Sequence, residues 1–385
     1  MILKIVCSVI NNFETRHIED WSIANNIAKY GTYTEFMSVG STAYKLPVYP
    51  LFLSVFAYLF PENSLAVIIV VQHLILFVVP IIIIKTLSLF GKEKVGILAA
   101  FIFIFSPAYF HYSNVIEVTN VFVPLFLIWI YVYSKIFLGK STTLYYVFFG
   151  ISTAVLFLTQ VVVIPIVMIL FLVLLLFKKI KITGLAIVLF VTAIFYSPWI
   201  VRNKMAFDKI ILTKTPVWQN IYLSFTSAPN ICNDVILIDD EHERYTFHLR
   251  KSVNEFEMER IYKEKTLEVL DGKEIIFIKK SLQNALLLWY VPSRYFYDNS
   301  LPILFGRKIF TIILNIFTIF FLFYIYKKYR LLFWISLLLF ANFTFPYMIG
   351  HASNTRFKLD FEWYQYILVA LFFLEIKNKE QFLYH

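Results

Sequence analysis

Long runs of apolar residues, separated by short polar loops, dominate this chain of 385 residues. Because the hydrocarbon core of a bilayer is about 30 Å thick, a helix needs about 20 apolar residues to cross it. The pattern predicts nine spans, at 65–84, 95–111, 118–134, 143–160, 161–177, 182–200, 308–326, 331–349 and 361–376. Helices are expected because lipid-exposed backbone must satisfy its own hydrogen bonds, and the sequence lacks barrel-type alternation. The predicted fold is therefore an all-α, polytopic transmembrane helical bundle.

Shorter apolar segments predict helices that do not cross the membrane. Residues 17–30 place apolar side chains at helical spacing and are followed by Gly31, which is typical of a helix lying on the membrane surface. Residues 47–60 are too short for a span and favour an interfacial or re-entrant helix. Residues 1–10 are also too short, so we expect either a truncated or misplaced start, which we favour, or a partial segment. Gln160 interrupts the apolar run 143–177 and predicts a turn, because a lone amide is costly in lipid.

The polarity of the chain changes after Pro198. Residues 201–280 hold 13 cations and 13 anions and little long apolar sequence, which predicts a soluble extracytoplasmic segment. Within it, 252–270 reads as a surface helix, and 281–297 returns to the interface with Trp and Tyr. Three regions follow from this pattern. They are an N-terminal transmembrane block at 1–200 with its first extracytoplasmic loop at 11–60, a soluble and interfacial segment at 201–300, and a C-terminal transmembrane block at 301–385.

Net charge is concentrated on five short loops between the predicted spans. They carry 13 cations against three anions, a balance of +10 that equals the formal charge of the whole chain. Because cytoplasmic loops carry an excess of Lys and Arg, we expect these loops to be cytoplasmic and the remaining loops to be extracytoplasmic. The protein is then a multi-pass protein of the cell membrane (plasma or inner). Nucleic acid is not expected as a partner, because the basic residues serve topology and form no single patch.

Candidate chemistry lies on the extracytoplasmic side. Glu19 and Asp20 lie in the first loop beside Trp21, where a carboxylate suits a general base acting on a hydroxyl or, alternatively, a solvated acid on an amphipathic helix. Glu117 begins a predicted span, where an ionisable group faces a cavity or the interface. Lys45, Arg202 and Arg356 place cations at the membrane boundary, where they suit a lipid phosphate or ordinary headgroup contact. With ten glycines and no glycine-rich phosphate loop, a lipid-linked donor is favoured over a nucleotide sugar.

Five segments carry a resemblance that covers almost the whole chain. They are EDWSIANNIAKYGTY, STAYKLPVYPLFLSVFAYLF, LFGKEKVGILAAFIFIFSP, SPWIVRNKMAFDKIILT and TRFKLDFEWYQYILVA. In this order and on one side of the membrane, they are similar to the motifs of the membrane-embedded GT-C glycosyltransferases, the branch that includes protein mannosyltransferases, aminoarabinose transferases and the glycosyltransferase 39-like family. The closing segment departs from the family, because Phe357 and Lys358 replace Tyr and Arg and the prolines are absent.

The resemblance implies a transferase that moves a sugar from a polyprenyl-phosphate donor, a membrane lipid, to an unknown acceptor. It implies that Glu19 is the first-loop catalytic acid, with Asp20 as the alternative, and that Glu117 is the second acid. It assigns Lys45, Arg202 and Arg356 to the donor phosphate. No cofactor is certain. A divalent cation shared by Glu19 and Glu117 is left open, although two carboxylates make a thin ligand set. A transporter or flippase of a lipid-linked glycan, or an inactive homologue, remains the alternative.

Overall fold

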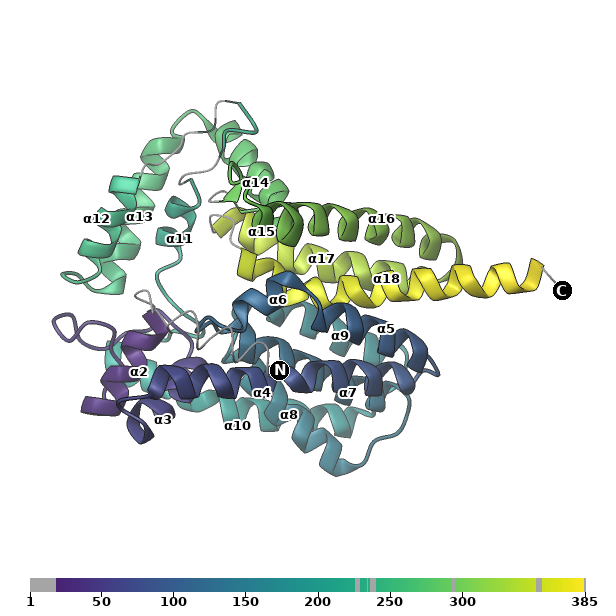
Figure 1. Cartoon of the computed structure of the whole chain (residues 1–385). Coiled ribbons are helices and arrows are strands. Elements are labelled where there is room, and N and C mark those ends of the chain that lie inside the picture. Colours follow the sequence, from purple (N-terminus) through teal and green to yellow (C-terminus); the bar gives the residue numbers. More distant parts are fainter. Residues whose placement is uncertain are drawn as a thin grey trace.

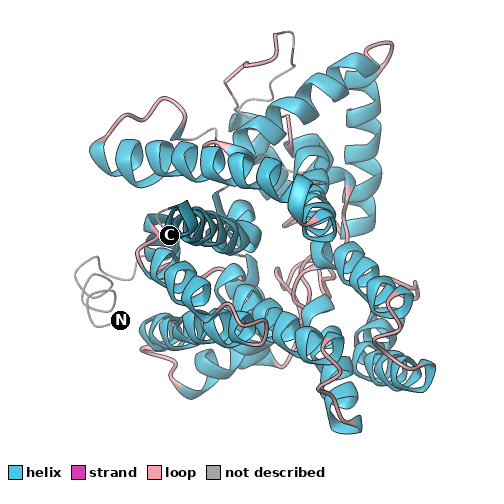
Figure 2. Ribbon diagram, turned by 90° about the vertical axis from the view of Figure 1, so that its right-hand side faces the viewer, coloured by secondary structure: helices cyan, strands magenta, loops and turns pink. Residues whose placement is uncertain are grey.

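The computed structural model describes residues 19–225, 229–233, 235, 240–292, 295–350 and 355–383, and Figures 1 and 2 show a helical architecture. Within these residues there is no β-strand. The all-α prediction is confirmed. The expectations for residues 1–10, and for the part of the first extracytoplasmic loop before Glu19, fall outside the described residues.

Every predicted span coincides with one or more helices. Among the described residues, five helices are long and apolar enough to cross a membrane: α4 (Ser64–Ser88), α7 (Thr119–Phe137), α10 (Ile182–Phe207), the continuous run Leu301–Lys328 and α17 (Arg330–Gly350). The run Leu301–Lys328 comprises α15 (Leu301–Ile303), a π-helix (Leu304–Ile309) and α16 (Phe310–Lys328). The remaining predicted spans fall on α5 (Glu93–Ile104) with α6 (Pro107–Tyr112), α8 (Thr143–Phe157), η1 (Val161–Val163) with α9 (Ile164–Leu176), and α18 (Thr355–Leu383).

Two of the predicted spans meet at a sharp break, as the lone amide at position 160 indicates. Helix α8 ends at Phe157, and Gln160 adopts an extended conformation with φ −150° and ψ 118° before η1 begins. The side chain of Asn342 on α17 holds this break, because it donates to the carbonyl of Val162 and accepts from the amide of Ile166. Backbone groups freed at the break are thus satisfied by a neighbouring helix, as membrane-embedded backbone requires. The predicted turn is confirmed.

Shorter helices cover one end of the bundle. Helix α2 (Glu19–Tyr30) packs against α3 (Val48–Leu59) and ends at Gly31, whose φ of +66° suits glycine. The 201–300 segment forms α11 (Trp218–Leu223), α12 (Asp240–Leu249), α13 (Glu255–Leu270) and α14 (Glu274–Trp289). Figure 1 shows α11, α12 and α13 projecting beyond the bundle at the same end as α2 and α3. The predicted surface helix at 252–270 is confirmed as α13.

Helix α18 is the central element of the bundle. It packs against α5 and α7 of the N-terminal block and against α16 and α17 of the C-terminal block. Leu359, Phe361 and Tyr366 on α18 are fully buried and belong to the main hydrophobic core. Because one helix contacts both blocks, the residues at its N-terminal end are held at the junction where the cavity described below opens.

The basic loops gather at the end of the bundle remote from α2 and α3. Lys92, at the start of α5, and Lys328, at the end of α16, both lie against Glu375 of α18, at 3.6 Å and 2.9 Å. Lys179 lies over the ring of Phe137, which joins two further basic loops. In Figure 1 the α16–α17 turn and the C-terminus lie at this end, opposite α2 and α3. The loops that carry the excess of Lys and Arg in the sequence therefore lie at one end of the helical bundle.

Candidate active site

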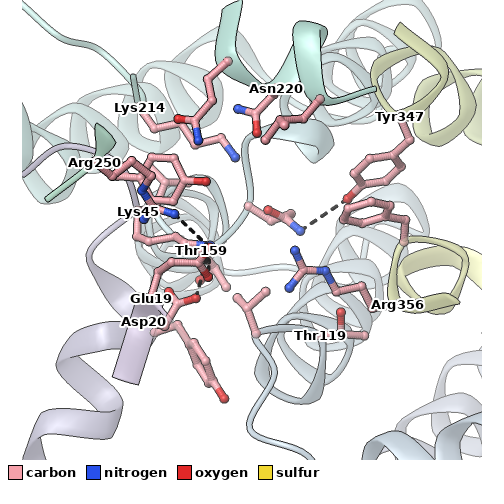
Figure 3. A pocket seen from close by; sticks show the side chains of 18 of the residues that line it. Glu19, Asp20, Lys45, Thr119, Thr159, Lys214, Asn220, Arg250, Tyr347 and Arg356 are labelled. Atoms are coloured by element: carbon pink, nitrogen blue, oxygen red, sulfur yellow. Dashed lines mark hydrogen bonds and ion pairs between the residues drawn. The ribbon is translucent and has the colours of Figure 1, made fainter. Parts of the chain in front are cut away.

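A cavity of about 360 Å³ opens at the end of the bundle opposite the basic loops. Its walls combine the start of α2, the segment before α3, the starts of α7 and α18, the α8–η1 break and parts of the 201–300 segment (Figure 3). Six ionisable Asp, Glu, Lys and Arg side chains line it: Glu19, Asp20, Lys45, Lys214, Arg250 and Arg356. Four cations thus face two carboxylates, which makes the cavity suited to an anionic ligand.

Two adjacent carboxylates sit at the N-terminus of α2. Glu19 and Asp20 are the first two described residues of this helix, where the helix dipole stabilises negative charge. The ammonium nitrogen of Lys45 lies 3.4 Å from Glu19 Oε2 and 3.5 Å from Asp20 Oδ2. Although adjacent residues on a helix diverge by about 100°, both acids reach the same cation, so the pair acts as one electrostatic unit.

The 201–300 segment supplies a second cation to these acids. Arg250, at the end of α12, places Nη1 3.3 Å from Glu19 Oε1, and its other nitrogen forms a buried ion pair with Glu35. The guanidinium also lies over the ring of Tyr44, 4.0 Å from its centroid. Arg250 therefore links the 201–300 segment to the first loop directly at the cavity.

Different surroundings separate the pKa values of the two carboxylates. Burial alone raises the pKa of Glu19, but Lys45 and Arg250 outweigh burial and hold that pKa well below its usual range. Burial raises the pKa of Asp20 above its ordinary value, in spite of the attraction of Lys45, and the negative charge of Glu19 adds to the rise. Glu19 is consequently a firmly ionised, weak base, whereas Asp20 is the stronger base of the two.

Across the cavity, Arg356 extends from the first turn of α18 on the side of Thr119 and Tyr347 (Figure 3). Its Nη1 lies 2.8 Å from Glu117 Oε2. Glu117 does not itself line the cavity and acts on it through Arg356. The two residues come from opposite blocks of the sequence, so this ion pair also joins α18 to the segment before α7.

Arg202 lies apart from this cluster. Its guanidinium donates to the backbone carbonyls of Thr42, at 2.7 Å, and Tyr33, at 2.9 Å, and packs over the rings of Tyr33 and Trp199. It is absent from the cavity lining. Of the six predicted site residues, the structure brings four into the cavity (Glu19, Asp20, Lys45, Arg356), a fifth to its edge (Glu117), and leaves Arg202 holding the loop that carries Lys45.

Lys214 and Arg250 line the cavity but were not singled out from the sequence. Lys214 reaches the cavity beside Asn220, opposite Glu19 and Asp20 (Figure 3). Within the described ranges no ion pair or hydrogen bond engages its side chain. Burial, together with the positive charges of Lys45 and Arg356, lowers the pKa of Lys214 to about 8. Because no described carboxylate pairs with this lysine, an anionic ligand in the cavity would balance its charge.

Glu19 and Glu117, the two acids considered for a divalent cation, are both engaged by cationic side chains. The ammonium of Lys45 already lies between Glu19 and Asp20, and Glu117 is engaged by Arg356. In the part of the chain that the structure describes, no group of three or more His, Cys, Asp or Glu side chains is arranged to hold a metal ion. Glu19 and Glu117 thus each contact a different cationic side chain, with which a divalent cation shared by the two acids would compete.

Comparisons with known proteins bear on the fold. No protein-family model matches the chain, and no curated protein sequence matches it. Among solved structures, it is similar to the archaeal oligosaccharyltransferase AglB from Archaeoglobus fulgidus, determined in complex with an inhibitory peptide and a dolichol-phosphate. The superposition has a TM-score of 0.56 at 13% sequence identity and covers 98% of this chain but 50% of that one, so this chain spans half the length of AglB. AglB is a GT-C enzyme, and the present chain accordingly has a GT-C-like, all-α membrane fold, as its motifs imply.

Proposed function

We propose that this protein is a membrane glycosyltransferase that transfers a sugar from a polyprenyl-phosphate donor to an acceptor hydroxyl. The observation that carries the proposal is the convergence of two carboxylates and four cations in one cavity at the end of the helical bundle. These groups come from residues 19–20, 45, 214, 250 and 356, which are far apart in the sequence. The fold shared with AglB, whose structure contains a dolichol-phosphate, supports a lipid-phosphate donor.

The proposed reaction needs a base and an anion-stabilising group. The acceptor oxygen attacks the anomeric carbon, the bond between that carbon and the phosphate oxygen breaks, and the acceptor proton passes to a carboxylate. Negative charge grows on the departing phosphate, and preorganised cations that meet this charge supply what is commonly the largest catalytic contribution. General-base assistance adds about 10²- to 10⁴-fold.

Within the acid pair, Asp20 is the favoured base. The sequence resemblance points first to Glu19, with Asp20 as the alternative. The low pKa of Glu19, held by Lys45 and Arg250, makes it a poor proton acceptor, whereas the raised pKa of Asp20 brings that carboxylate nearer to the operating pH. In this proposal Glu19 orients Lys45 and Arg250, and Asp20 takes the proton.

Among the cations, Lys45, Arg356 and Lys214 are proposed to receive the donor phosphate. Lys45 and Arg356 already hold carboxylates and contribute oriented charge, while Lys214 contributes a charge that no described carboxylate balances. Glu117 positions Arg356. Arg202 is proposed to act indirectly, since its donors hold the loop from Tyr33 to Thr42 that precedes Lys45.

The orientation in the membrane follows from the two ends of the bundle. Helices α7, α17 and α18 each carry a cavity residue at one end and basic residues at the other. If the basic end faces the cytoplasm, as the distribution of Lys and Arg favours, the cavity opens on the extracytoplasmic side of the cell membrane. A lipid-linked sugar that has been presented on that side would reach the cavity from the bilayer.

The experiment compares Asp20→Asn and Glu19→Gln in a transfer assay with a radiolabelled polyprenyl-phosphate sugar and native membrane acceptors. Asp20→Asn is expected to lower turnover by about 10²- to 10⁴-fold while changing donor binding little, and Glu19→Gln is expected to cost less. Glu257→Gln, an exposed acid on α13 paired with Arg260, is the matched control. Unchanged transfer in both cavity variants would mean that neither acid takes part in the reaction. Donor binding by the wild-type protein without any transfer would favour a flippase.

A further inference from the structure

A buried carboxylate lies directly behind one wall of the cavity. Asp360, on α18, is fully buried and accepts hydrogen bonds from three residues. Thr119 Oγ1 donates to its Oδ1 at 3.0 Å, and Tyr347 Oη and Gln160 Nε2 donate to its Oδ2 at 2.8 Å and 3.3 Å. All three donors line the cavity, whereas Asp360 does not. One carboxylate therefore fixes the orientation of polar groups from α7, the α8–η1 break and α17.

The direction of these hydrogen bonds decides what the wall offers a ligand. Asp360 is the acceptor in all three contacts, so the hydroxyl hydrogens of Thr119 and Tyr347 and an amide hydrogen of Gln160 point toward its carboxylate oxygens. The Gln160 amide also donates to Tyr347 Oη at 3.4 Å. The groups that can still bind a ligand in the cavity are therefore acceptors. They are the hydroxyl lone pairs of Thr119 and Tyr347 and the Gln160 Oε1 atom, for which no hydrogen bond is found within the described ranges.

A wall of acceptors is complementary to a ligand rich in hydroxyl donors. Resting on the proposed function, we propose that Thr119, Gln160 and Tyr347 form a subsite for the hydroxyl groups of the transferred sugar, and that Asp360 is the positioning residue that sets their hydrogen-bond polarity. Tyr347 stacks on Phe357, with ring centroids 4.1 Å apart, and both rings line the cavity. The subsite thus offers an aromatic surface beside the acceptors, which suits the apolar face of a sugar ring.

The subsite lies beside Arg356, one of the cations proposed for the donor phosphate. Arg356 is one helical turn before Asp360 and is engaged by Glu117, and the carboxylates of Glu19 and Asp20 lie across the cavity from Thr119 and Tyr347 (Figure 3). The three subsite side chains are themselves neutral, and a buried carboxyl group lies behind them. Neutral acceptors discriminate sugars by their hydroxyl pattern, because a missing donor leaves a desolvated acceptor without a partner.

The test measures two affinities for the purified protein: that for polyprenyl phosphate without a sugar and those for a panel of polyprenyl-phosphate hexoses. In the wild type, at least one hexose is expected to tighten binding beyond the bare lipid. In Asp360→Asn, an amide offers one oxygen and one NH₂ group, so at least one of the three donors loses its acceptor and turns toward the cavity. The sugar-dependent gain is expected to fall by about 10-fold, with bare-lipid affinity unchanged.

Tyr347→Phe provides a second variant that keeps the stack on Phe357 and removes one hydroxyl. It is expected to lose part of the same gain, whereas Tyr364→Phe, which loses a hydrogen bond to Ser336 away from the cavity, is expected to lose none. An equal sugar-dependent gain in wild type, Asp360→Asn and Tyr347→Phe would overturn the subsite, as would the absence of any gain across the panel. Failure of the bare lipid to bind the wild type would instead count against the proposed function.

Discussion

The cavity end and the basic end of the bundle place their charges in different environments. At the cavity end, Arg250 and Glu35 expose only 8% and 5% of their side chains and pair across 215 positions of sequence. At the basic end, Lys92 and Lys328 expose 47% and 48% of theirs, although both meet Glu375. Buried pairs of this kind are costly to break because a lone partner stays desolvated, whereas exposed pairs contribute little. The exposed charges of the basic end are therefore suited to orienting the protein in a membrane. The buried ion pairs of the cavity end are suited to holding side chains in fixed positions.

Substitution of Arg250 is expected to have the largest effect on the stability of the cavity end. Arg250→Ala removes the buried ion pair with Glu35 and one of the two cations that contact Glu19, and it is expected to lower the free energy of unfolding by about 2–4 kcal/mol. Thermal unfolding in detergent measures this effect. Arg260→Ala is the control, because Arg260 is 58% exposed and its ion pairs among the described residues are with acids on its own helix. Similar losses in the two variants would contradict the distinction between buried and exposed pairs.

Arg250 also shows where the sequence stops being informative. Helical spacing is local, so the pattern predicts α2, the break at Gln160 and the surface helix α13 from neighbouring residues. The contact between Arg250 and Glu19 joins residues separated by 231 positions. Nothing in the composition of the 201–300 segment distinguishes this arginine from the others. Its role depends on how the segment folds back over the first loop, which periodicity does not encode.

The same limit explains the opposite outcome for Arg202 and Lys214. The sequence analysis singled out Arg202, in its motif after Pro198, and not Lys214. The structure turns Arg202 toward the carbonyls of Tyr33 and Thr42, while Lys214, 12 positions later in the sequence, reaches the cavity. Position along the chain placed both cations at the correct end of the bundle. The path of the chain from α10 to α11 decides which of the two lines the cavity.

The pH dependence of phosphate binding distinguishes Lys214 from the lysines at the basic end. Its pKa of about 8 means that it loses its proton between pH 7.5 and 9.5, while an exposed lysine at the basic end stays charged. Binding of polyprenyl phosphate is expected to weaken several-fold over this interval, because the protonated form attracts the phosphate and the neutral form does not. Isothermal titration at a series of pH values measures the effect.

Lys214→Arg tests the assignment of this pH dependence. An arginine stays protonated throughout the interval, so the variant is expected to bind with little change between pH 7.5 and 9.5. Lys209→Arg is the matched control, since Lys209 packs over Phe256 and does not line the cavity. A decline in Lys214→Arg as steep as that of the wild type would assign the titration to another group.

The smallest effect is expected at the basic end, and it completes the comparison. Lys328→Gln removes a 2.9 Å ion pair with Glu375, but Lys92 and the hydroxyl groups of Tyr324 and Tyr329 still lie against that carboxylate. Because Lys328 is about half exposed, the variant is expected to change the free energy of unfolding by less than about 1 kcal/mol and to leave sugar transfer unchanged. Thermal unfolding and the transfer assay measure both. A large loss of turnover would mean that charge at this end reaches the cavity through α18, whose two ends would then no longer be independent.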